Sequence, residues 1–121
     1  MGRDEILNMP AGREMDALIA EKVMGLWTGP LTPLETEVAL AHGMIFSYSW
    51  DIAGAWQVVE KMVTNGWRFY CASMDIGTFV DAPIRAAEFQ KGDVTGPYVK
   101  NKSETIPLAI CKSALIAVLD I

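Results

Sequence analysis

The segment from 106 to 119 is apolar almost all round, and this feature limits the possible folds more than any other. Thr105 is a good N-cap residue, and Pro107 fits the first turn of a helix. Only Lys112 and Ser113 interrupt the apolar run that follows. A helix without a polar face is buried on all sides. We therefore expect this helix to be the most buried of the chain.

A second helix is predicted from about residue 11 to residue 24. Pro10 precedes it and Gly25 follows it, which is typical of a helix start and a helix end. Charged residues, Asp16 among them, occupy the faces outside the apolar stripe and are expected to be solvated. The stripe consists of Met15, Leu18, Ile19, Val23 and Leu26.

A third helix is predicted from about residue 50 to residue 64. Either Ser49 or Asp51 can cap its first turn, and Asn65-Gly66 provides a left-handed end. One apolar face is expected to pack in the core. It consists of Ile52, Ala55, Trp56, Val59 and Met62.

Short strands are expected between the last two helices. Residues 67–71 alternate between apolar and polar, and further strands are plausible around 78–80, 84–89 and 98–100. Helices outside a mostly antiparallel sheet predict one α+β domain over residues 1–121. In its simplest form the last helix covers one face of the sheet and another helix covers the opposite face.

Composition excludes several classes of function. Ten Lys plus Arg against fifteen Asp plus Glu give a net charge of −5, which disfavours nucleic acid and anionic membranes as partners. One His and two Cys cannot form a four-ligand zinc site or a disulfide framework. The glycines form no phosphate-binding motif, so we expect no cofactor. The start of the chain lacks a signal-peptide pattern, and we expect a location in the cytoplasm of a bacterial host.

Three stretches of the sequence together resemble the phage ABA-sandwich domain family, a group of small phage and prophage proteins. They are residues 11–23, 48–62 and 104–119. The most distinctive parts are Arg-Glu-Met-Asp at 13–16 and Pro-Leu-Ala-Ile-Cys at 107–111. The resemblance implies an α/β/α sandwich with three main helices around a small sheet, and a phage origin. It implies no activity and no catalytic residues.

Catalysis is a weaker hypothesis than binding. His42 is the only histidine, so a histidine-dependent nucleophile would need it, and no motif surrounds it. It lies in residues 31–46, where we recognise no family pattern and expect at most a short helix over 35–41 that Gly43 ends. Cys71 and Cys111 lie in apolar segments that favour buried thiols.

We therefore predict a non-enzymatic accessory protein that acts by binding. Aromatic and arginine side chains dominate binding hot spots, and the proposed surface combines Tyr48, Trp50, Arg68 and Tyr70. The partner is expected to be a host protein or a small molecule such as a nucleotide signal. A structural homo-oligomer and an enzyme that uses His42 are the alternatives.

Overall fold

The computed structural model describes residues 2–26, 32–43, 46–74, 84–92, 98–102 and 105–121. The elements are α1 (Arg3–Asn8), α2 (Arg13–Leu18), the π-helical η1 (Ile19–Val23), α3 (Pro33–Ala41), α4 (Ile52–Thr64), β1 (Trp67–Met74), β2 (Ile84–Lys91), β3 (Tyr98–Lys102) and α5 (Ile106–Leu119). The predicted α+β class is confirmed. None of the helices within the described ranges is both long enough and apolar enough to cross a membrane.

The three strands form an antiparallel sheet in the order β1-β2-β3. Phe69 on β1 lies opposite Phe89 on β2, which in turn lies opposite Val99 on β3. The rings of Phe69 and Phe89 are 5.3 Å apart between centroids. Because side chains alternate along a strand, Phe69 and Phe89 mark one face of the sheet, and the complete burial of Phe89 shows that this face is covered.

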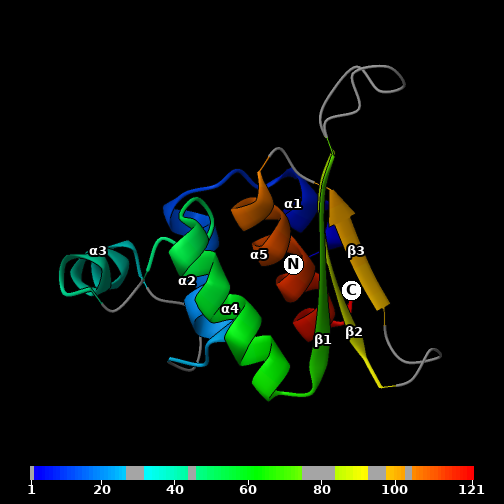
Figure 1. The fold of residues 1–121 in the computed structure, drawn as a ribbon. Coiled ribbons are helices and arrows are strands. Elements are labelled where there is room, and N and C mark those ends of the chain that lie inside the picture. The colour runs from blue at the N-terminus through cyan, green and yellow to red at the C-terminus, as the bar shows by residue number, and fades with distance from the viewer. Residues whose placement is uncertain (1, 27–31, 44–45, 75–83, 93–97, 103–104) are drawn as a thin grey trace.

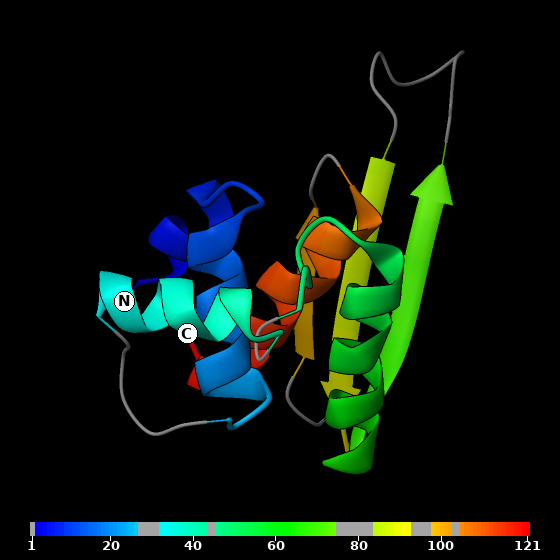
Figure 2. The ribbon, with the colours of Figure 1, turned by 90° about the vertical axis from the view of Figure 1, so that its left-hand side faces the viewer.

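Both large helices lie on that covered face (Figures 1 and 2). α5 packs against β2 and β3, while α4 lies beside α5 and over β1. η1 packs against α5 as well, on its side away from the sheet, so that the side chains from 108 to 117 are all buried. A layered α+β sandwich is confirmed, but α4 lies on the same face of the sheet as α5 and does not cover the opposite face as expected. A helix that is apolar all round needs cover on every side, and α4, η1 and the sheet together provide it.

Two polar groups of α5 are satisfied inside this packing. The Lys112 ammonium group donates a hydrogen bond to the carbonyl oxygen of Leu7 at 2.6 Å, and the Ser113 hydroxyl donates to the carbonyl oxygen of Ala87 at 2.7 Å. The first bond attaches α1, which the sequence analysis did not predict. α1 has six residues, and Ile6 is its buried residue. One buried residue in so short a helix gives no detectable hydrophobic periodicity.

The helix predicted over 11–24 changes its geometry half-way. The amide of Met24 donates to the carbonyl oxygen of Ile19, which is a π-helical bond, and Gly25 then ends the helix with a φ of 68°. Leu26 is consequently exposed, so the apolar stripe ends at Val23, three residues earlier than predicted.

The short helix expected over 35–41 is confirmed as α3. The Thr32 hydroxyl accepts a hydrogen bond from the Glu35 amide, and the Glu35 carboxylate accepts one from the Thr32 amide, as in a capping box. Gly43, with a φ of 70°, follows the helix. The expected strand at 78–80 lies outside the described residues.

Thr105 is the N-cap of α5, as the sequence predicts. The Thr105 hydroxyl accepts a hydrogen bond from the Leu108 amide at 3.3 Å. We expect Thr105→Ala to lower the free energy of unfolding by about 1 kcal/mol, because that amide loses its partner. Urea unfolding followed by circular dichroism measures the change, with Thr105→Ser as the control that keeps the cap. Equal stability of the alanine variant would show that the hydroxyl contributes nothing.

Candidate functional site

The structure separates the four residues predicted to share a binding surface. Tyr48 is 1% exposed, and its ring packs edge-on against Phe46 at 6.0 Å between centroids. Burial raises the pKa of the Tyr48 hydroxyl. The assignment of Tyr48 to a surface is therefore wrong. The segment before α4 packs closely on that helix, with the Ser47 backbone against Gly54, and Tyr48 belongs to the core.

Trp50 is exposed, but it lies at the N-terminal end of α4, away from the other two residues. Its side chain lies close enough to the Asp16 carboxylate to lower the pKa of that group. The structure thus pairs Trp50 with α2, whereas the predicted surface needed it next to β1.

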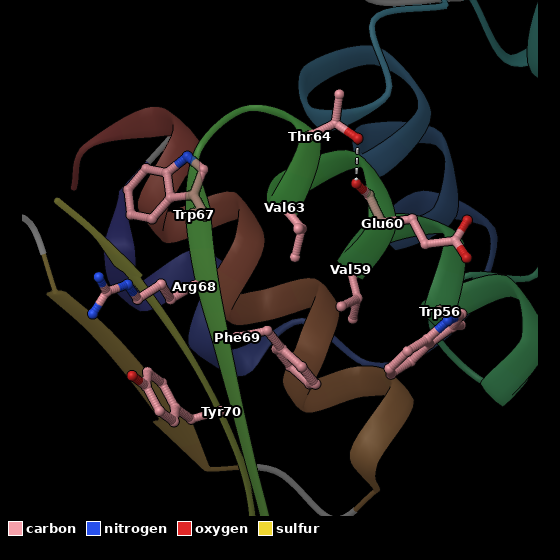
Figure 3. A pocket seen from close by; sticks show the side chains of 9 residues that line it. All are labelled: Trp56, Val59, Glu60, Val63, Thr64, Trp67, Arg68, Phe69 and Tyr70. Carbon is pink, nitrogen blue, oxygen red and sulfur yellow. Dashed lines mark hydrogen bonds between the residues drawn. The ribbon is translucent and has the colours of Figure 1, made fainter.

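Arg68 and Tyr70 lie on β1 and line a groove between that strand and α4 (Figure 3). The groove is open to solvent and has a volume of about 840 Å³. It is lined by Trp56, Val59, Glu60, Val63, Thr64, Trp67, Arg68, Phe69 and Tyr70.

The apolar part of the α4 wall of this groove is partly exposed. Trp56 and Val63 are each 51% exposed, and buried Val59 lies between them in the sequence. The prediction that Trp56 belongs to the core is wrong. The helix turns a different face inward, consisting of Gly54, Ala55, Val58, Val59 and Met62.

Aromatic rings connect the groove to the core. Trp56 packs edge-on against Phe69, with 6.1 Å between ring centroids and 83° between ring planes. Phe69 in turn packs on the fully buried Phe89. The contact with Phe69 holds the Trp56 side chain in place, so it presents a positioned apolar surface.

The other wall of the groove is the outer edge of β1. Residues 67–70 all line the groove, although consecutive side chains of a strand point to opposite faces. Figure 3 shows Phe69 pointing toward α4, with Arg68 and Tyr70 on the other side of the strand. The groove therefore follows the outer edge of β1. There, every second residue points its backbone N–H and C=O groups outward, where they can pair with another strand.

The charges in the groove are balanced. Glu60 on α4 and Arg68 on β1 are the two charged residues of the lining. Neither forms an ion pair with another residue that the structure describes. The Thr64 hydroxyl donates a hydrogen bond to the backbone carbonyl of Glu60 at 2.8 Å, so it is used within α4 (Figure 3).

Comparison with known proteins places the sequence in a family. Residues 17–115 match the phage ABA sandwich domain family. The chain belongs to this family. No curated protein and no solved structure matches it.

Other reactive groups of this phage ABA sandwich protein are not part of the groove lining. His42 is exposed in the turn after α3, where its backbone amide donates to the Val38 carbonyl oxygen at 3.1 Å. Within the ranges that the structure describes, no three His, Cys, Asp or Glu residues are grouped so that they could hold a metal ion. Cys111 is buried, which raises the pKa of its thiol well above the ordinary value. Cys71 is exposed, which corrects the prediction that both thiols are buried.

The two N-terminal family stretches contain a buried polar cluster that the sequence analysis missed. The Asp16 carboxylate accepts a hydrogen bond from the Ser49 amide at 2.8 Å, and the Ser49 hydroxyl accepts one from the Gly12 amide at 2.9 Å. Asp16 is 3% exposed and Ser49 is fully buried. Asp16 was expected on a solvated face, so that assignment is wrong. The capping role falls to Asp51, whose carboxylate accepts from the Ala53 amide.

Proposed function

We propose that this phage-family protein acts by binding a protein partner, and that the partner occupies the groove between α4 and β1. The observation that carries the proposal is the position of Trp56. Tryptophan is enriched at binding hot spots, and half of this side chain is exposed although its ring is held against Phe69. Exposure of such an apolar surface to water is unfavourable.

The shape and charge of the groove favour a protein over a nucleotide. Pockets for small molecules enclose most of the surface of the ligand, whereas this groove is open along a strand. Arg68 is the only cationic residue in its lining and is balanced by Glu60, so the groove does not concentrate positive charge for a phosphate.

Affinity capture with matched tryptophan variants tests this proposal. The baits are the tagged chain, Trp56→Ala and Trp50→Ala, each incubated with an extract of bacterial cells that express the untagged chain. We expect a protein that the wild type and Trp50→Ala retain equally, and that Trp56→Ala binds about tenfold more weakly. Trp50 is the control because it is exposed but lies outside the groove.

Circular dichroism should first establish that all three baits are folded. Two results would contradict the proposal. One is retention that does not differ between the three baits, and the other is the absence of any retained protein.

A further inference from the structure

We infer that the partner which fills this groove is a second copy of the same chain, joined through the outer edge of β1. This inference rests on the proposed function, because it identifies the protein that the groove would bind. It follows from two neighbouring surfaces, a strand edge and a helix face, that need different kinds of cover.

The first surface is the outer edge of β1. β1 is an edge strand of eight residues, and within the described residues only its other edge is paired, with β2. Long edge strands usually carry lysine, proline or a bulge that prevents pairing with another strand. β1 contains none of these in its sequence, and Arg68 is its only charged residue.

The opposite edge of the sheet differs in this respect. β3 has five residues, and two of them are Lys100 and Lys102. A short strand with two lysines is protected against pairing in the usual way. The sequence therefore leaves β1 as the edge that is suited to pair with a further strand.

The second surface is the exposed apolar side of α4 next to that edge. Ile52, Trp56 and Val63 are each about half exposed. Trp56 and Val63 line the same groove as residues 67–70 of β1. A bare extended peptide could pair with the strand, but it would bring no helix to cover this side of α4.

A second copy related by a two-fold axis would cover both surfaces at once. If β1 pairs antiparallel with its counterpart, the two sheets become one six-stranded sheet, and both α4 helices lie on the same face across the joint. Each α4 then brings its own apolar side to the other. The balanced charges of Glu60 and Arg68 make the groove compatible with an identical copy despite the net charge of −5.

The exposed area is sufficient for such an interface. A covered aromatic side chain buries about 150–250 Å², so Trp56, which is half exposed, leaves on the order of 100 Å². With Ile52, Val63 and the strand edge, two copies would bury on the order of 1,000 Å², where specific interfaces begin.

Sedimentation velocity on the purified chain tests the inference. We expect a species of twice 13.3 kDa that dissociates on dilution. Val63→Lys should raise the dissociation constant at least tenfold. Val38→Lys should leave it unchanged, because Val38 is 48% exposed on α3 and is therefore a matched control for Val63, which is 51% exposed.

Cross-linking of the unmutated chain provides a second readout. Cys71 lies near the middle of β1 and is exposed, whereas Cys111 is buried. In the antiparallel pair the two Cys71 residues come close together, so a short bismaleimide should join them into a covalent dimer. Cys71→Ser should abolish that product.

The results separate the two proposals. A chain that stays monomeric at 100 µM, or a dimer that neither Val63→Lys weakens nor Cys71 cross-links, overturns the second copy as the partner. Groove-dependent retention of a different protein by the baits would then leave the proposed function standing. Absence of groove-dependent retention would overturn both.

Discussion

Replacement of Gly54 by alanine is expected to lower the free energy of unfolding by about 3 kcal/mol, although alanine is the better helix former. A Cβ atom at Gly54 would lie 2.8 Å from the carbonyl oxygen of Ser47 and 2.9 Å from its carbonyl carbon. Overpacking of a core costs about 1–3 kcal/mol and occasionally more. We expect the upper end, because backbone atoms cannot rotate away as a side chain can.

The helix propensity of alanine offsets only part of this cost. In an exposed helix, Gly→Ala gains about 1 kcal/mol. Urea unfolding of the variant measures the net effect. Gly2→Ala is the control, because a Cβ at Gly2 meets nothing within 4 Å, and we expect a change within about 0.5 kcal/mol. If Gly54→Ala unfolds at the same urea concentration as the wild type, the contact between α4 and Ser47 is not tight.

The same contact explains why the sequence predicted the extent of α4 but not its inward face. Two apolar stripes overlap on this helix, one through Ile52 and Trp56, the other through Ala55 and Met62. Periodicity cannot choose between them, because both fit a helix. The choice depends on which side carries the small residue that lets the Ser47 backbone approach, and this side contains Gly54.

Local signals were sufficient where one residue determines the structure. Thr105 caps α5 as predicted, and Asp51, one of the two candidates that the sequence offered, caps α4. Gly66 has the expected left-handed φ of 95°. The all-round apolar run of α5 predicted its burial, which extends over residues 108–117. Each of these inferences needed only neighbouring residues and the requirements of the helix backbone.

The candidate groove could be predicted only in part. Arg68 and Tyr70 were identified by residue type, but Trp56 and Val63 depend on the rotation of α4. Tyr48 was misplaced because its burial depends on packing between segments distant in the sequence. The absence of edge protection on β1 is visible in the sequence, but it gains meaning only once the strand order places β1 at an edge.

The buried cluster around Asp16 gives the second large expected effect. Asp16→Ala should lower the free energy of unfolding by about 2 kcal/mol, because the buried Ser49 amide loses its acceptor. Asp16→Asn should cost less, since its side-chain oxygen can still accept that hydrogen bond. Urea unfolding at pH 7 should therefore rank the wild type and the asparagine variant above the alanine variant.

The pH dependence of Asp16 follows from the direction of its pKa shift. Burial raises the pKa of Asp16 above its ordinary value of 3.8, and this outweighs the interactions with Ser49 and Trp50 that lower it. Between the unfolded and folded pKa values the native state binds more protons than the unfolded state, so stability due to Asp16 falls as the pH rises through this interval.

Asp16→Asn removes the titrating carboxyl group. Comparison with this variant therefore isolates the contribution of Asp16 to the pH dependence of the free energy of unfolding. We expect the free energy of unfolding of the wild type, minus that of Asp16→Asn, to fall as the pH rises above 3.8 and then to level off. Urea titrations at closely spaced pH values measure this difference. If the difference instead rises with pH, the carboxylate is stabilised as an anion, and the interactions with Ser49 and Trp50 outweigh its burial.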